Sequence, residues 1–254
     1  MLDHKPLILV TNDDGIHAPG IQALFAAMQE IGQAVMIAPE QDASASSHSL
    51  TMKRPLRVRQ LTPEIHAIDG TPTDCVTVGI KKVLPRKPDL VVSGINPGPN
   101  LGDDINYSGT VAAAKEGTLL GVPSFAVSLV AHNGGDFFHA ARFAAQLAAG
   151  ILSSGLPRDT FFNVNVPDLP AAELRGARFT RQGRRLYDDA IKETFDPWGA
   201  RHYWIGGGTP YWDEGPDTDA QAVLAGAISV TPLHIDLTNH EALARLRTEW
   251  PLGS

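Results

Sequence analysis

The sequence predicts an α/β protein whose mostly parallel sheet is covered by helices on both faces. Short apolar runs of strand length alternate along the chain with longer segments whose apolar residues recur at helical spacing. The runs are continuous, as expected for strands buried on both faces. The chain has 254 residues, of which 43% are hydrophobic and 19% charged, and this is enough for one large core.

The first predicted unit is a strand, a turn and a helix. Residues 7–10 form an apolar run that ends in the polar turn 11–15, and Pro19 suits the first turn of a helix. The apolar face of that helix consists of Ile21, Leu24, Phe25 and Met28.

The alternation of strands and helices continues to about residue 166. Thr71 and Ser108 are predicted helix caps, and Asp74 completes a variant of the capping box with Thr71. In chain order we expect a strand at 35–38, a polar serine-rich loop at 40–49, a helix after Thr71, a strand at 90–92, a loop at 93–107, a helix after Ser108, a strand at 124–129, a helix through Phe143 and Leu147, and a strand at 161–166.

The pattern changes after about residue 181. We predict a catalytic core at residues 1–180 and a C-terminal β-rich extension at residues 181–254, which together make one functional unit. The extension is crowded with large aromatic residues: Trp198, Tyr203, Trp204, Tyr211 and Trp212. They are expected either to pack against a second subunit or to cover the core of their own chain.

Charge and composition restrict the classes of partner. A formal net charge of −7 and an isoelectric point near 5.7 argue against binding of long nucleic acid. The sequence shows neither a signal-peptide pattern nor an apolar run of membrane-spanning length, so we expect a cytoplasmic protein without a membrane partner. Cys75 is the single cysteine and is interpreted as a small buried hydrophobe.

Polar loops follow three of the predicted strands, at the edge where parallel sheets bind ligands. The first carries Asp13 and Asp14, the second Ser44, and the third, at 93–104, asparagines. Carboxylate, hydroxyl and amide oxygens favour magnesium, manganese or calcium over zinc, and the nine histidines lack paired spacing. Taken alone, an acidic pair before glycine is more often a solvated turn than a metal site.

Ser108, Gly109 and Thr110 begin a predicted helix and are a candidate phosphate site. Free backbone amides and the positive end of the helix dipole favour an anion there, although a plain helix cap would also explain Ser108. The motifs of phosphate-loop, dinucleotide-binding and serine-hydrolase proteins are not found in the sequence.

The chain closely resembles the SurE (survival protein E) family of metal-dependent 5′-nucleotidases over nearly its full length. The resemblance rests on four segments in this order: Thr11–Gly20, Gly70–Val76, Ser93–Asn96 and Tyr107–Val111. It implies a Rossmann-like core and a C-terminal extension exchanged between subunits, hence a homodimer or homotetramer. It also implies nucleoside 5′- and 3′-monophosphates as substrates, with short polyphosphate as a further one.

The resemblance further implies site residues and a cofactor. Asp13, Asp14, Ser44 and Asn96 would bind one divalent metal ion per subunit, magnesium or manganese, and Asn96, Ser108, Gly109 and Thr110 would hold phosphate. The sequence departs from the family pattern at residues 40–43, so Ser46 and Ser47 compete with Ser44 as the serine ligand.

From these residues we expect in-line displacement at phosphorus, with Asp13, Asp14 and Asn96 in catalytic roles. Asp13 would act as a base, as a nucleophile or only as a ligand, and the sequence leaves these open. Two alternatives use other chemistry. One is a nucleotide-binding or sensing protein without turnover, and the other is a nicotinamide-dependent protein, which the missing glycine motif disfavours.

Overall fold

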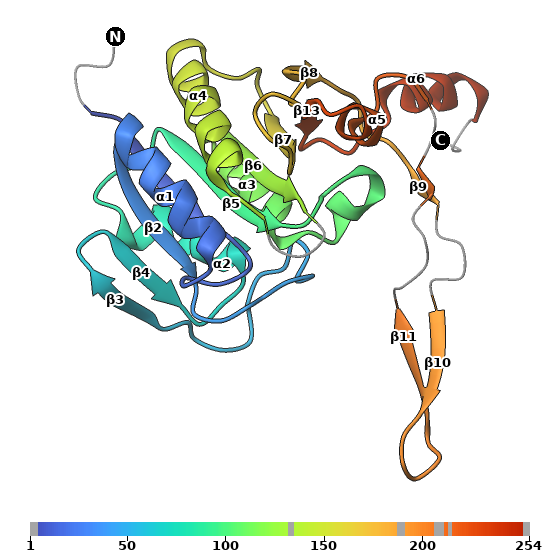
Figure 1. Ribbon diagram of the computed structural model, residues 1–254, viewed down its shortest axis with the longest axis horizontal. Helices are drawn as coiled ribbons and strands as arrows, with labels where there is room; N and C mark the ends of the chain where they lie inside the picture. Colours follow the sequence, from blue (N-terminus) through green and yellow to red (C-terminus); the bar gives the residue numbers. More distant parts are fainter. Residues whose placement is uncertain (1–4, 132–134, 187–190, 206–210, 213–214, 251–254) are drawn as a thin grey trace.

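A computed structural model describes residues 5–131, 135–186, 191–205, 211–212 and 215–250 (Figure 1). Its main sheet has nine strands in the order β3-β4-β2-β1-β5-β6-β7-β13-β8. These strands are β1 (Leu7–Thr11), β2 (Gln33–Pro39), β3 (Val58–Thr62), β4 (Ile65–Ile68), β5 (Leu90–Pro97), β6 (Ser124–Val130), β7 (Thr160–Pro167), β8 (Ala177–Phe179) and β13 (Ile228–His234).

Strand β1 lies where the order of the strands reverses. It pairs in parallel with β2, with Val10 opposite Met36, and in parallel with β5, with Val10 opposite Val92. Strands β5, β6 and β7 continue the parallel sheet, whereas β3 and β13 run antiparallel to their neighbours β4 and β7. Such a reversal opens a crevice at the carboxyl ends of the strands.

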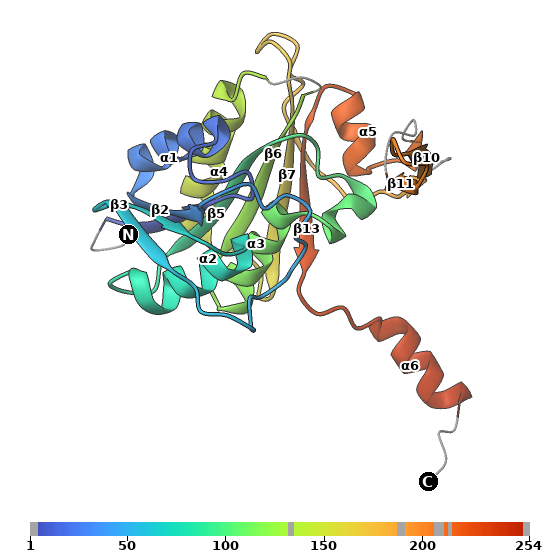
Figure 2. The same ribbon diagram turned by 90° about the horizontal axis from the view of Figure 1, so that it is seen from below.

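Helices cover both faces of the sheet, as Figure 2 shows. Helices α1 (Pro19–Ile31) and α4 (Phe138–Ser154) pack on one face, and α2 (Pro72–Val78) and α3 (Gly109–Leu119) pack on the other. A hydrophobic cluster lies on each face of the sheet, and alternate residues of β1 pack into one or the other. Ile8 lies in the cluster under α1 and α4, and Leu9 lies in the cluster under α2. The predicted α/β fold, with its mostly parallel Rossmann-like sheet, is confirmed.

Local signals in the sequence locate several of these elements correctly. Pro19 is in the first turn of α1, and all four predicted apolar residues of that helix are buried. Thr71 and Asp74 form the capping box of α2, in which Cys75 is buried, and a π-helical turn, η1 (Gly79–Val83), follows. Ser108 caps α3 by accepting a hydrogen bond from the amide of Val111 at 3.1 Å.

The predicted loop at 93–107 is partly regular. Strand β5 continues to Pro97, and a 3₁₀ helix, η2 (Gly102–Asn106), precedes α3. The glycines in this segment predict a loop, but Gly94 is part of the strand. Its φ is +134°, and an added β-carbon would lie 2.2 Å from the carbonyl oxygen of Val127 on β6. The register between β5 and β6 shifts between Ser93 and Asn96, as in a bulge.

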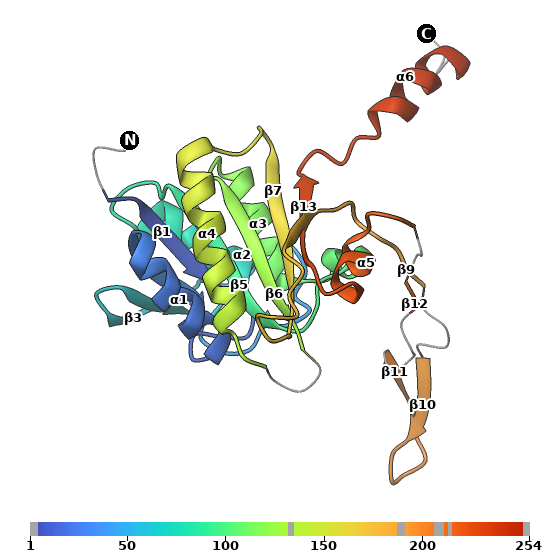
Figure 3. The same cartoon turned by 45° about the horizontal axis from the view of Figure 1, so that its top comes forward.

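One part of the segment after residue 181 belongs to the main sheet, and two other parts project from it. Strand β13 pairs with β7 and β8, and α5 (Asp219–Leu224) packs on it. In contrast, the hairpin of β10 (Ile191–Phe195) and β11 (Arg201–Ile205) and the helix α6 (His240–Glu249) project from the body (Figure 3). Short strands β9 (Arg185–Leu186) and β12 (Tyr211–Trp212) pair at the base of this hairpin.

The aromatic residues of the hairpin are exposed to solvent. Trp198 is 89% exposed and Trp204 is 67% exposed, and Tyr203 is also exposed. These three therefore do not cover the core of their own chain, whereas the side chains of Tyr211 and Trp212 lie outside the described part of the structure. The division of the chain at residue 180 stays a prediction. Among the described helices, none combines the length and apolar character needed to cross a membrane.

Candidate active site

The acidic pair lies in a tight turn at the end of β1. The side-chain amide of Asn12 donates a hydrogen bond to the carbonyl of Gly15 at 3.0 Å, and Gly15 has a φ of +99° that favours glycine. The turn leaves Asp13 buried and Asp14 half-buried. The two carboxylates are thus held at the crevice beside β1 rather than in a solvated surface turn.

The N-terminus of α3 packs directly against Asp13. The hydroxyl of Thr110 donates a short hydrogen bond to Oδ1 of Asp13, and the backbone of Thr110 hydrogen-bonds the same carboxylate. A β-carbon added at Gly109 would lie only 2.8 Å from Cβ of Asp13. The structure therefore brings Gly109 and Thr110 together with Asp13, from which they are nearly 100 residues distant in sequence.

The electrostatics of the pair favour a cation. Burial raises the pKa of Asp13 above its ordinary value. Burial, followed by the charges of Asp13 and Asp42, raises the pKa of Asp14 to about 7. The buried Oδ2 of Asp14 and Oδ1 of Asn12 have no hydrogen-bond partner among the described residues. Two repelling carboxylates with uncompensated oxygens fit a divalent metal ion, which would neutralise them.

The loop after β2 brings serines to the same place. The amide of Ala43 donates to the carbonyl of Asp13 at 2.8 Å, which ties this loop to the turn. The hydroxyl and amide of Ser44 both donate to Asp42, at 2.5 and 2.7 Å. Oγ of Ser46 is close to the acidic pair, because it is 2.9 Å from the position of a β-carbon on Gly109, which itself lies against Asp13.

Asn96 approaches the crevice from β5. Strand β5 is the parallel neighbour of β1, with Ser93 opposite Thr11, so Asn96 and Asp13 extend beyond the same edge of the sheet. The side-chain amide of Asn96 donates to the carbonyl of Gly98 at 2.8 Å. Its side-chain oxygen thereby points in another direction and is an acceptor suited to a metal ion or a donor group.

Sequence reasoning missed a polar cluster that joins the serine loop to α3. Nε2 of His48 lies 2.9 Å from Oε2 of Glu116, and the hydroxyl of Thr77 donates to Oε1 of Glu116 at 2.7 Å. The hydrogen bond with His48 and then that with Thr77 lower the pKa of the Glu116 carboxyl, against the effect of burial. The burial of Glu116 is visible only in the structure, because its partners come from other elements. The histidine that follows the acidic turn, His17, is exposed to solvent.

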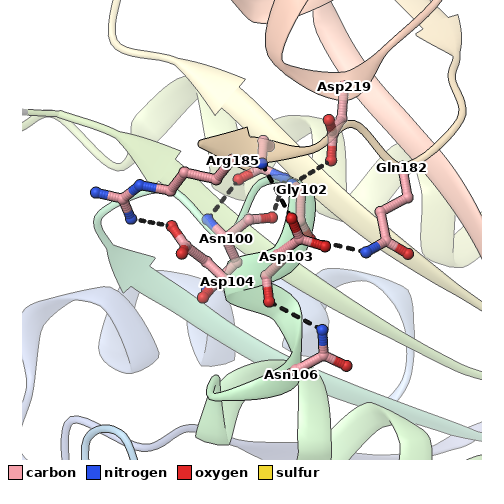
Figure 4. A network of polar contacts seen from close by, with 9 residues as sticks. Asn100, Gly102, Asp103, Asp104, Asn106, Gln182, Arg185 and Asp219 are labelled. Atoms are coloured by element: carbon pink, nitrogen blue, oxygen red, sulfur yellow. Dashed lines mark hydrogen bonds and ion pairs between the residues drawn. The ribbon is translucent and has the colours of Figure 1, made fainter. Parts of the chain in front are cut away.

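A second missed network fixes η2, the turn that leads into Ser108 (Figure 4). The carboxylate of Asp219 accepts hydrogen bonds from the amides of Gly102 at 2.8 Å and Gly183 at 2.9 Å. Asp104 forms an ion pair with Arg185, whose amide donates to Asp103 at 3.1 Å. The network ties η2 to residues more than 80 positions later, a connection that no local pattern reveals.

Comparisons with known proteins agree with this geometry. The family model described as Survival protein SurE matches residues 8–189. A protein of Geobacter sulfurreducens named 5′-nucleotidase SurE is 54% identical over 248 residues, covering 97% of this chain and 94% of that protein. One of Pelobacter propionicus with the same name is 51% identical over 244 residues, covering 96% and 98%.

A solved structure shows the same fold. The crystal structure of the SurE protein from Aquifex aeolicus matches with a TM-score of 0.87 and 43% sequence identity, covering 96% of this chain and 99% of that one. The chain belongs to the SurE family.

Proposed function

We infer that the protein is a 5′-nucleotidase, a phosphomonoesterase that acts on nucleotides. One structural observation carries this inference: a pair of carboxylates, one buried and one half-buried, at the reversal of strand order, with the N-terminus of α3 packed against it. The names of relatives that are about half identical over nearly the whole chain support it. The alternative, a nucleotide-binding protein without turnover, is less favoured.

The enzyme is metal-dependent, as its family is, and we propose one magnesium or manganese ion per subunit. Asp13, Asp14, Ser44 and Asn96 would hold it, with Ser46 as the alternative serine. This donor set consists of oxygens alone, as these cations prefer. When bound, the ion supplies Lewis-acid chemistry at a phosphoryl oxygen and offsets the charge of the carboxylates.

The proposed reaction is an in-line displacement. A water oxygen attacks phosphorus as the bond from phosphorus to the nucleoside oxygen breaks, and the products are a nucleoside and inorganic phosphate. Asp13 orients this water or takes its proton, and Thr110 holds Asp13 in place. Asn96, Ser108 and the free amides at the start of α3 offset charge on the phosphoryl group.

Finer features of the function are also proposals. We propose that the substrates include nucleoside 5′- and 3′-monophosphates and short polyphosphate, and that the enzyme is cytoplasmic. We propose a homodimer or homotetramer in which the C-terminal extension is exchanged between subunits. The exposed aromatic hairpin supports this assembly, because such a surface is unfavourable in water.

The test is phosphate release from a panel of nucleoside monophosphates by metal-stripped protein, with magnesium, manganese, zinc or nothing added back. We expect release that depends on added metal. Asp13→Asn should leave folding intact and reduce turnover by roughly a thousandfold. Asp217→Asn is the matched control, because Asp217 is exposed and its φ of 64° suits asparagine. An active Asp13→Asn protein would refute the assignment of Asp13, and nucleotide binding without release under every metal would favour the alternative.

A further inference from the structure

A cavity of about 210 Å³ lies beside the start of α3, next to the proposed phosphate site. Its apolar walls include Val111 and Ala112 of α3, Phe161 of β7 and Leu233 of β13. Sites for drug-sized ligands are larger, roughly 300–1,000 Å³, so this cavity suits a single small ring system. Apolar walls with a few polar groups are the usual composition of a ligand site.

Two carboxamides on the rim of this cavity present hydrogen-bond acceptors. The NH₂ group of Gln182 donates to the carbonyl of Gly102 at 3.1 Å, and that of Asn106 donates to the carbonyl of Asp103 at 3.0 Å. Because the oxygen of a carboxamide points away from its NH₂ group, both oxygens are left to accept other bonds. Figure 4 shows the NH₂ group of each residue on its dashed hydrogen bond and the oxygen on the other branch of the carboxamide. Beside donors such as Lys115 and Ser108, the cavity therefore also offers two acceptors to a ligand that carries N–H donors.

The cavity is adjacent to the reacting end of the site. Ser108, which begins α3, lines it, and the next two residues of that helix contact Asp13. His48 lines it too, at the end of the loop that places Ser46 beside Gly109. Gln182 on its rim donates to the carbonyl of Gly102 at the start of η2, and the amide of Gly102 in turn donates to Asp219 (Figure 4). A group joined to a phosphate at the start of α3 can thus extend over Ser108 into a preformed cavity.

We propose that this cavity binds the base of the nucleotide substrate and favours the 6-amino group of adenine and the 4-amino group of cytosine over a keto oxygen at the same position. This inference rests on the proposed nucleotidase function. The amino group donates to the oxygens of Gln182 and Asn106, whereas a keto oxygen faces them without a proton to share. The base ring packs on Phe161 and the apolar face of α3.

The experiment compares kcat/KM for AMP with IMP and for CMP with UMP, pairs in which an amino group is replaced by a keto group. Ribose 5-phosphate serves as the base-free substrate. We expect the wild-type protein to favour the amino member of each pair roughly tenfold, the usual effect of leaving buried acceptors unpaired. Gln182→Met should bring both ratios close to one while the rate with ribose 5-phosphate is kept. Ala112→Met, which fills the cavity, should raise KM for every nucleotide but not for ribose 5-phosphate.

Two control variants sharpen the result. Gln146→Met changes an exposed amide on α4, on the other face of the sheet, and should alter no ratio. Arg54→Met probes a polar cavity of about 330 Å³ that borders Asp42, an alternative place for a nucleoside. The proposal is overturned if Arg54→Met rather than Ala112→Met raises KM for nucleotides, or if Gln182→Met leaves the ratios unchanged. Failure of the nucleotidase function itself is distinct: the wild type would then release phosphate from none of these substrates, and calorimetry with adenosine and inosine would still test the cavity.

Discussion

The hydroxyl of Thr110 donates a hydrogen bond to Oδ1 of Asp13, and this bond joins the first turn of α3 to the tip of β1. Thr110 therefore contacts a member of the acidic pair directly. The bond directs Oδ1 toward the helix and fixes the orientation of the carboxylate. A buried hydrogen bond to a charged acceptor stabilises this arrangement by about 1.5–3 kcal/mol.

Thr110→Val tests this bond, because valine has a similar shape but no hydroxyl. Loss of a charge-assisted hydrogen bond should weaken binding of manganese and lower kcat, each by roughly 10- to 100-fold. Thr110→Ser keeps the hydroxyl and should restore both quantities to within about threefold of the wild type. Manganese titration and steady-state kinetics provide the two measurements. Equal losses in the valine and serine variants would contradict the role of the hydroxyl.

Gly109→Ala tests the close approach of α3 to Asp13. The new methyl group would lie 2.8 Å from Cβ of Asp13 and 2.9 Å from Oγ of Ser46, so the turn or the helix must shift. We expect at least a tenfold loss of phosphate release and a stability loss of about 1–3 kcal/mol in urea unfolding. Gly150→Ala in α4 is the control: nothing lies within 4 Å of its added carbon, and alanine favours helix by up to about 1 kcal/mol. Similar effects of the two substitutions would contradict a specific contact.

The raised pKa of Asp14 predicts how stability of the metal-free protein depends on pH. Because the folded-state pKa, about 7, exceeds the ordinary value of 3.8, the contribution of Asp14 to stability is fully present below pH 4 and is lost as the pH rises through 7. Asp14→Asn should therefore gain stability relative to the wild type between pH 5 and pH 8. The gain is of the order of 1–2 kcal/mol after discounting for solvent screening of a half-buried group. Urea unfolding in a chelator measures it, and a difference that is constant with pH would refute it.

The exposed hairpin predicts self-association. Replacing Trp198 and Trp204 with serine should weaken the assembly at least tenfold, because each tryptophan buries a large apolar area in an interface. Sedimentation velocity over a range of concentrations gives the dissociation constant. Phe138→Ser is the control, since Phe138 is 60% exposed on α4, outside the hairpin. A wild-type protein that sediments as a monomer at every concentration would exclude the proposed oligomer.

Much of the fold follows from local patterns in the chain. Continuous apolar runs predict the strands, and the capping box of Thr71 with Asp74 predicts the start of α2, because strand burial and helix capping depend on neighbouring residues. The extension of β5 to Pro97 was not predicted. Gly94 reads as a loop residue, and only the approach of Val127 on β6 explains why a glycine stands within the strand.

By itself, the sequence determined that Asp13, Asp14 and the start of α3 are candidate sites of chemistry, since each follows a buried strand or begins a helix. Tertiary structure decided which of these groups touch: Thr110 binds Asp13, Ser46 lies beside Gly109, and Asp219 fixes Gly102. Secondary structure depends on residues a few positions apart, whereas a hydrogen bond across about 100 residues exists only once the sheet has set the order of its strands.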